Sequence, residues 1–190
     1  MADFTIHTKD SAPEASKDLL EITQAKYGFI PNLLGEMAEA PSLLKAYLTV
    51  GEALEASSLT AQEQQVVILT VSYLNECSYC MTAHSAVAKT VGLPDDEIDA
   101  LREGQPMSDA KLEALRAFTG ILVEKRGWAS DEDIAAFLTA GYTRAQVLEV
   151  ILGIAFKTMS NFTNHVADTP IDKQFAPFTW EPAGRAHSAV

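Results

Sequence analysis

Apolar residues recur at helical spacing along most of the chain, and short polar segments separate the runs. Capping boxes at 60–63 and 143–146 introduce two of the runs, because a threonine hydroxyl and a Glu or Gln three residues later satisfy the free amides of a helix start. Glycines follow several runs and prolines precede others, as is typical of helix ends and first turns. The pattern predicts nine helices, at about 13–27, 31–39, 41–56, 60–75, 77–91, 94–103, 108–126, 130–140 and 144–165.

One segment is open to a second interpretation. Residues 66–73 are rich in β-branched side chains and would also suit a buried strand. The capping box directly before them favours a buried helix, and no Asn-Gly or Asp-Gly hairpin signal occurs in the chain. We therefore predict an all-α fold.

The helical pattern ends near Asp168, where spaced prolines and aromatic residues replace it. We expect a single helical domain over residues 1–167 and, over 168–190, a C-terminal arm that packs on this core or on a neighbouring subunit. Its last residues, 184–190, are expected to fray. A weak similarity between 68–84 and 151–165 suggests an internal duplication.

Composition narrows the classes of function. The 190 residues include 26 acidic and 14 basic side chains, so the formal charge is −12, which disfavours binding to nucleic acids or anionic lipids. The first residues lack a basic segment followed by an apolar one, and the apolar run 147–156 contains Glu149 and is too short for a bilayer of about 30 Å. We expect a soluble cytoplasmic protein.

The only two cysteines, Cys77 and Cys80, provide the strongest chemical signal, together with His84. If a helix begins near Asn75, the three side chains share one face, at positions i, i+3 and i+7. A helix start and a nearby imidazolium stabilise a thiolate, and a second sulfur can trap an oxidised first one as a disulfide. We therefore predict a redox-active dithiol at the mouth of a helix, open to an oxidant.

The residues alone leave other readings open. Cys77 lies nearer the helix start, whereas Cys80 lies one turn from His84, so either sulfur is a candidate nucleophile. The cysteines are alternatively buried packing residues of an oligomeric module. A third possibility is a zinc site formed by Cys77, Cys80, His84 and perhaps His165, although structural zinc usually has four ligands.

The segment from Leu59 to His84, with Asn75 and the Cys77-Ser-Tyr-Cys80 motif, resembles the carboxymuconolactone decarboxylase superfamily on its alkyl hydroperoxidase D-like side. A looser similarity covers 147–172. The resemblance implies an all-helical homo-oligomer, often a trimer or hexamer, that needs no cofactor or metal. It implies reduction of hydroperoxides or disulfides, with a thioredoxin-like or dihydrolipoyl reductant.

By the same resemblance, Cys80 is the peroxidatic cysteine, Cys77 the resolving one and His84 part of a proton relay. Because the cysteine pair is present, lactone decarboxylation is disfavoured. A member that acts on another small organic substrate remains an alternative.

The chain departs from the family pattern at two positions. Gln65 stands where the family has a relay carboxylate, and an amide cannot accept a proton. Tyr79 occupies a position between the cysteines where the best-known peroxidase of the group has histidine, and a phenol is a poor base near neutral pH. The nearest acids are Glu63, which the capping box already explains, and Glu76, which lies next to Cys77.

A second polar cluster lies on one face of the last predicted helix. Asn161, Asn164 and His165 are spaced i, i+3 and i+4. They are candidates to line the pocket of His84 or to contact a neighbouring subunit, and otherwise they cap the end of the helix.

Overall fold

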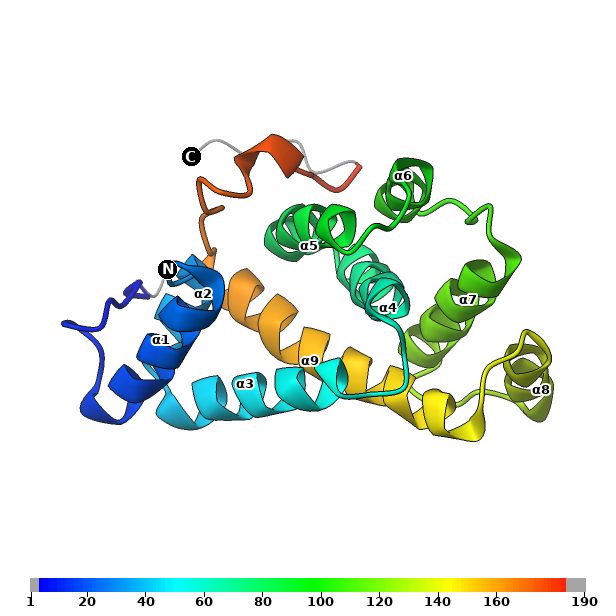
Figure 1. Cartoon of the computed structure of the whole chain (residues 1–190), viewed down its shortest axis with the longest axis horizontal. Helices are drawn as coiled ribbons and strands as arrows, with labels where there is room; N and C mark the ends of the chain where they lie inside the picture. Colours follow the sequence, from blue (N-terminus) through cyan, green and yellow to red (C-terminus); the bar gives the residue numbers. More distant parts are fainter. Residues whose placement is uncertain (1–3, 184–190) are drawn as a thin grey trace.

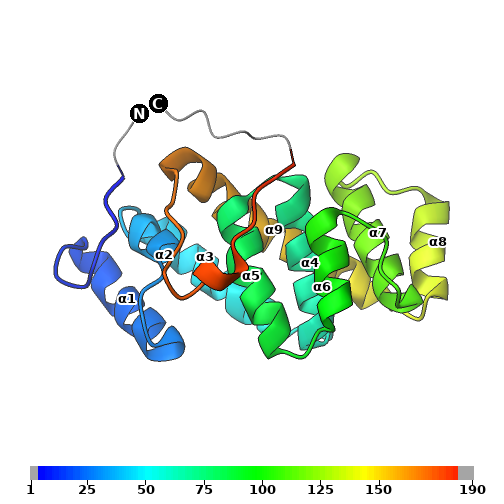
Figure 2. The same ribbon diagram turned by 90° about the horizontal axis from the view of Figure 1, so that it is seen from above.

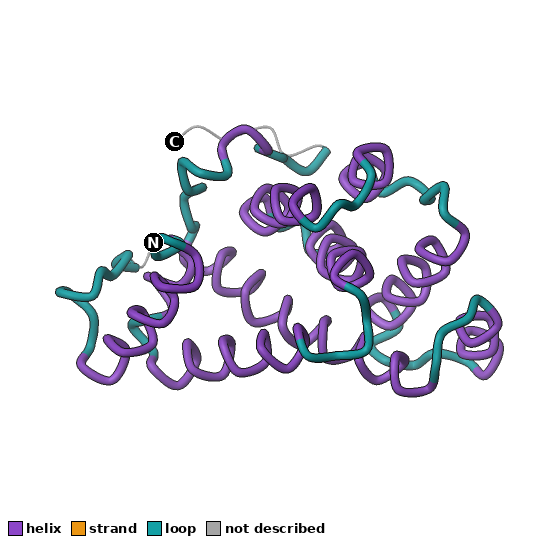
Figure 3. Tube along the Cα trace, in the orientation of Figure 1, coloured by secondary structure: helices purple, strands orange, loops and turns teal. Residues whose placement is uncertain are grey.

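The computed structural model describes residues 4–183, and this range consists of helices and loops without a strand (Figure 3). The helices are α1 (Glu14–Tyr27), α2 (Asn32–Met37), α3 (Pro41–Glu55), α4 (Ala61–Leu74), α5 (Ser78–Thr90), α6 (Asp95–Glu103), α7 (Ala110–Glu124), α8 (Asp131–Thr139), α9 (Arg144–Ala167) and a short 3-10 helix η1 (Ala176–Phe178). All nine predicted α-helices are present, with ends that differ from the prediction by at most two residues. The all-α prediction is confirmed, and residues 66–73 lie inside α4.

The expected start and stop signals operate as predicted. Both predicted capping boxes form, before α4 and before α9, and a third, unpredicted box starts α8 at Ser130 and Asp133. Five glycines that follow helices have the left-handed backbone conformation that a residue without a Cβ adopts most readily: Gly28, Gly92, Gly104, Gly127 and Gly141. Gly104 has a second constraint, because a Cβ there would lie 2.3 Å from the Tyr73 ring.

The helices form an elongated molecule with α9 running through most of it (Figures 1 and 2). Helices α1 and α2 lie at one end and α7 and α8 at the other, α3 runs from the first end toward the middle, and α4, α5 and α6 lie between the ends. Helix α9 contacts α2, α3, α4, α5, α7 and α8. Two hydrophobic clusters result: a larger one around α4, α6 and α7, and a smaller one where α1–α3 meet α5 and α9. Both cysteines belong to the smaller cluster.

Helix α9 has two contrasting faces. Its buried positions follow helical spacing and change from apolar to polar along the helix: Val150, Gly153, Lys157, Ser160, Asn161 and Asn164. The opposite face carries exposed apolar side chains, which we call the exposed α9 stripe: Leu148, Ile151, Phe162 and Val166. No described helix is long and apolar enough to cross a membrane.

The C-terminal arm, over its described part 168–183, lies across α5 of its own chain (Figure 1). The Trp180 backbone N–H donates to Thr82 Oγ1 at 3.0 Å, and Ser78 Oγ donates to Glu181 at 3.2 Å. Arg102 on α6 donates to the Phe178 carbonyl at 3.0 Å. Residues 184–190, which were expected to fray, lie outside the described residues.

The two segments of the suggested duplication differ in structure. The first is broken between α4 and α5, whereas 151–165 lies within the single helix α9. The similarity in sequence therefore does not extend to the local fold.

Candidate functional site

The cysteine pair is positioned by the turn between α4 and α5. Helix α4 ends at Leu74, and Glu76 takes a left-handed conformation with φ 51° that reverses the chain. Cys77 is the N-cap residue of α5, which begins at Ser78. The helix thus starts three residues later than the Asn75 start assumed from the sequence, and Cys80 lies in its first turn, close to free backbone N–H groups.

Helix α9 supplies polar contacts to the sulfur atoms. Asn164 Nδ2 lies 3.1 Å from Cys80 Sγ and 3.5 Å from Cys77 Sγ, so one amide group bridges both cysteines. Lys157 Nζ lies 3.3 Å from Cys80 Sγ, and Ser160 Oγ lies 3.7 Å from the same sulfur. Both cysteines are free thiols rather than a disulfide. Cys80 therefore sits in a polar recess formed by one side of α9.

These contacts separate the acidities of the two sulfurs. Burial opposes ionisation of Cys80, but the hydrogen bond from the Cys77 thiol and the charge of Lys157 outweigh it and hold the pKa of Cys80 well below that of an ordinary thiol. The pKa of Cys77 is raised, because its S–H donates to Cys80 and because it is buried. The arrangement favours a thiolate at Cys80 and a protonated thiol at Cys77.

His84 faces α4 instead of the sulfurs. Its Nδ1 lies 3.0 Å from Gln65 Oε1, and because that oxygen only accepts, the proton resides on Nδ1 and Nε2 is free to accept. Burial and the positive charge of Lys157 lower the pKa of His84 well below its ordinary value, so the ring is neutral at pH 7. Within residues 4–183 the side chains that hydrogen-bond to Cys80 Sγ are those of Cys77, Lys157, Asn164 and Ser160, not that of His84. The expected direct use of His84 by Cys80 is thus absent from this geometry.

Lys157 is the site residue that sequence reasoning missed. Its only sequence signal is its place in the buried polar series 157, 160, 161 and 164 of an otherwise apolar helix face. A lysine at such a core position is rarely buried without a charged partner. Here its partner is a sulfur 77 residues earlier in the chain.

The remaining predicted acids lie apart from the sulfurs. Glu63 accepts from the Thr60 backbone N–H at 2.8 Å and from Lys111 Nζ at 2.9 Å, so its carboxylate is engaged on the α7 side of α4. Glu76 is exposed.

Tyr79 donates to the buried carboxylate of Asp172 in the arm, which together with burial raises the pKa of the phenol. Asp172 is therefore a second residue near the site that sequence reasoning missed.

The three residues of the predicted polar cluster on α9, Asn161, Asn164 and His165, do not all face the same surroundings. Asn164 contacts both sulfurs, and Asn161 accepts from Asn75 Nδ2 at 2.9 Å, which ties the turn before Cys77 to α9. His165 lies on the exposed side of the helix. Two of the three residues therefore support the cysteine pair, one directly and one through the turn.

The described residues do not form the zinc site that the sequence left open. Within the described part of the chain, no group of three His, Cys, Asp or Glu side chains is placed to hold a metal ion. The zinc alternative used His84 and perhaps His165, which lie on separate helices, α5 and α9, and His84 Nδ1 is paired with Gln65.

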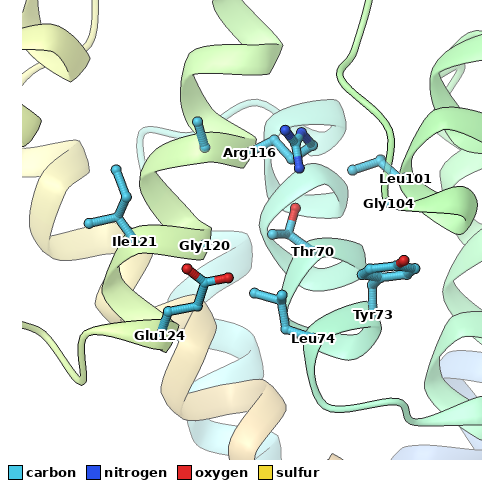
Figure 4. Close-up of a pocket in the computed structure, with 10 residues that line it drawn as sticks. Thr70, Tyr73, Leu74, Leu101, Gly104, Arg116, Gly120, Ile121 and Glu124 are labelled. Carbon is cyan, nitrogen blue, oxygen red and sulfur yellow. The ribbon is translucent and has the colours of Figure 1, made fainter.

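The sulfurs are less open than the sequence led us to expect. Cys77 and Cys80 are each 1% exposed, and they share the smaller hydrophobic cluster with Tyr79 and with residues of α2 and α3. A cavity of about 370 Å³ lies between α4, α6 and α7, and its lining includes Thr70 and Tyr73 of α4 and Arg116 and Glu124 of α7 (Figure 4). A second, largely apolar cavity of about 470 Å³ lies between α2, α3 and the C-terminal half of α9. The cysteines line neither of these cavities, and both sulfurs are closed to solvent in this structure.

The fold and the paired thiols define an all-helical protein with a buried CxxC dithiol at a helix start. Residues 41–120, less than half of the chain, match the model of the carboxymuconolactone decarboxylase family. This segment is therefore similar to the carboxymuconolactone decarboxylase family, and the chain has the AhpD-like helical fold, as the resemblance of the CxxC segment indicated.

Several solved structures have a similar fold, and their superpositions cover nearly the whole chain. A peroxidase-related protein with an alkylhydroperoxidase AhpD core from Ralstonia eutropha JMP134 superposes with a TM-score of 0.81 at 20% identity, covering 90% of this chain and 93% of that one. A peroxidase-related protein from Silicibacter sp. TM1040 gives a TM-score of 0.77 at 20% identity, with 92% of each chain covered. A cysteine-to-alanine variant of the debrominase Bmp8, in complex with 2,3,4-tribromopyrrole, gives 0.78 at 18% identity, covering 94% and 96%. No curated protein matches the sequence.

Proposed function

We propose that the protein is a thiol-dependent oxidoreductase in which Cys80 attacks a hydroperoxide or a disulfide and Cys77 resolves the oxidised sulfur. The observation that carries the proposal is the asymmetric environment of the two thiols. The Cys80 sulfur contacts the positively charged ammonium group of Lys157 and the side-chain amide of Asn164, whereas Cys77 keeps its proton. A thiolate next to a protonated thiol is the arrangement that nucleophilic attack followed by disulfide closure requires.

With a hydroperoxide, the chemistry proceeds in two steps. Cys80 sulfur bonds to the terminal peroxide oxygen, the O–O bond breaks, and a sulfenic acid and an alkoxide are formed. The Cys77 thiol then attacks the Cys80 sulfur and displaces hydroxide, which leaves as water with the Cys77 proton. The resulting disulfide returns to the dithiol by exchange with an external dithiol, which we propose to be thioredoxin-like or dihydrolipoyl in character.

We assign His84 to proton exchange with solvent. Its ring is neutral, its Nε2 is free to accept because Gln65 holds the proton on Nδ1, and it is only partly buried. These properties suit a group that passes protons between the buried site and water.

The test is a single-turnover oxidation of the reduced protein. With one equivalent of alkyl hydroperoxide, we expect both thiols to be lost and an intramolecular disulfide to appear by mass spectrometry. Cys77→Ser should stop at a sulfenic acid that a dimedone probe traps, and Cys80→Ser should leave the peroxide unconsumed. Full peroxide consumption by Cys80→Ser, or none by the native protein, would overturn the assignment.

Reductive debromination of a small aromatic ring is a second candidate. The Bmp8 structure shares this fold, and here the stacked rings of Tyr47 and Phe156 lie in or against the hydrophobic cluster that contains the cysteines. Replacement of ring bromine by hydrogen needs two electrons, which oxidation of a dithiol to a disulfide supplies. Bromide release from 2,3,4-tribromopyrrole by the reduced protein, absent from Cys80→Ser, would support it; unchanged thiols would exclude it.

A further inference from the structure

Lys157 is a fully buried cation in direct contact with the reactive sulfur. Its side chain is 0% exposed, and its Nζ lies 3.3 Å from Cys80 Sγ. The Phe156 ring lies beside it, 5.4 Å from Nζ to the ring centroid, so the ammonium group is held between an aromatic ring and the Cys80 sulfur, away from solvent. A buried charge of this kind requires a counter-charge.

The counter-charge is the Cys80 thiolate. No carboxylate of the described residues lies within ion-pair distance of Lys157 Nζ. The titratable groups around the ion pair are Cys77, Tyr79 and His84 from the α5 region and Tyr47 from α3. Both phenols have raised pKa values because of burial, the raised pKa of Cys77 reserves its proton for the later closure of the disulfide, and His84 carries no positive charge, so Lys157 is the cationic proton donor in contact with the sulfur.

Oxidation of Cys80 removes this counter-charge. A sulfenic acid or a disulfide is neutral, so an ammonium group that stayed protonated would be left buried without a partner. The same step creates an alkoxide leaving group that needs a proton. The family position for a relay carboxylate holds Gln65, which cannot supply one.

We propose that Lys157 is a catalytic residue of the proposed peroxide reduction: its ammonium group donates a proton to the leaving alkoxide as the Cys80 sulfur is oxidised. This inference rests on the proposed function.

The step balances in charge and protons. The Cys80 thiolate provides two electrons to the O–O bond and takes up the terminal OH, Lys157 gives one proton to the alkoxide, and an alcohol leaves. Lys157 becomes a neutral amine as the thiolate becomes a neutral sulfenic acid. The Cys77 thiol then closes the disulfide and releases water, and Lys157 regains its proton when an external dithiol restores the Cys80 thiolate.

The experiment must separate proton donation from simple stabilisation of the thiolate. In the Cys77→Ser background Cys80 is the only thiol, and its rate constants with tert-butyl hydroperoxide and with iodoacetamide are measured at the same pH. Both reactions consume the thiolate, but iodide leaves without a proton. Their ratio therefore cancels the thiolate fraction and reports the acid. We expect Lys157→Met to lower the ratio by about 100-fold, a usual contribution of general acid catalysis.

Two further measurements keep the test decisive. Lys111→Met removes another lysine paired with a buried group, at 2.9 Å from Glu63, and should leave the ratio unchanged. If Lys157→Met does not fold, Lys157→Gln takes its place. In the protein that keeps Lys157, the peroxide reaction should be slower in deuterium oxide than in water, whereas the alkylation rate should be the same in both.

The outcomes distinguish the two claims. An unchanged ratio in a folded Lys157 variant, with rapid peroxide reduction by the parent, overturns the acid role and leaves the proposed function standing. A parent protein that reacts with iodoacetamide but not with any hydroperoxide overturns the proposed peroxide reaction itself.

Discussion

At the scale of single residues, Asn164 shows how one side chain sets the charge of the site. Its amide nitrogen contacts both sulfurs, while its Oδ1 is buried and has no hydrogen-bond partner among the described residues. An unpaired buried oxygen costs stability. The amide is thus oriented for its contact with the sulfurs at the expense of its own oxygen.

Asn164→Asp changes this contact with almost no change in shape. A carboxylate against the Cys80 sulfur destabilises the thiolate, so we expect the pKa of Cys80 to rise by at least about one unit and its alkylation rate at neutral pH to fall about tenfold. The pH dependence of iodoacetamide labelling measures both. Asn161→Asp is the matched control, because Asn161 contacts Asn75 and Ser72 instead of sulfur. An unchanged profile in Asn164→Asp would contradict the assigned contact.

A second prediction at this scale concerns His84 and the pH dependence of stability. Because its folded pKa is depressed below the ordinary 6.5, its stabilising contribution is complete above pH 6.5 and is lost as the pH falls toward the folded pKa. The native protein should lose up to about 1.4 kcal/mol of unfolding free energy per pH unit through this residue between pH 6.5 and about 5. Urea titrations of native protein and His84→Gln give the difference. Parallel pH curves would show that His84 is not desolvated.

At the scale of elements, the helices follow from local signals. Thr60 and Thr143 cap helices through contacts only three residues away, and the terminal glycines act through their own backbone. Such signals are complete within a short window of sequence. Nine helices of this chain were therefore predictable, including α4 despite its β-branched residues.

The capping box of α4 can be tested directly. Thr60→Ala removes the hydroxyl that accepts from the Glu63 backbone N–H at 3.2 Å, and we expect a loss of about 1 kcal/mol in unfolding free energy. Thr60→Ser keeps the hydroxyl and should recover most of the loss. Equal stability of all three proteins in chemical denaturation would mean that the box contributes nothing.

Only part of the site was predictable, because some of its contacts join residues that are far apart in the sequence. Cys77, Cys80 and His84 lie close in sequence, so their proximity follows from one helix start. Lys157 and Asp172 approach the CxxC segment only through the packing of α9 and the arm against α5. His84 was expected at the sulfurs because it shares their side of α5, but Gln65 on α4 provides the hydrogen bond that turns its ring away.

At the scale of the molecule, Asp172 joins three parts of the fold. Its carboxylate, on the arm, accepts from Tyr79 on α5 and from the backbone N–H of Asn32 at the start of α2, 3.1 Å away. Tyr79 lies between the two cysteines in sequence, and α2 is part of the cluster that covers them. The same carboxylate thus holds the cover of the buried dithiol in place.

Asp172→Ala should loosen this cover. It leaves the Tyr79 hydroxyl and the Asn32 amide without their acceptor, so we expect about 1–3 kcal/mol less stability and at least about tenfold faster labelling of the native thiols by a bulky disulfide reagent. Lys173→Ala, at the exposed neighbouring position, is the control. Lower stability with unchanged labelling would show that the thiols open by another route.

The exposed α9 stripe has a consequence for solutions of this protein. Phe162 is 57% and Val166 70% exposed on a molecule with a net charge of −12, so two copies repel through their charge but gain from covering these side chains. Added salt shortens the range of repulsion to about 10 Å at 0.1 M and leaves the apolar attraction intact. Sedimentation should therefore show heavier species as sodium chloride is raised, and Val166→Glu should abolish that trend. The ionic strength of the buffer, as well as the protein concentration, then decides how many copies travel together.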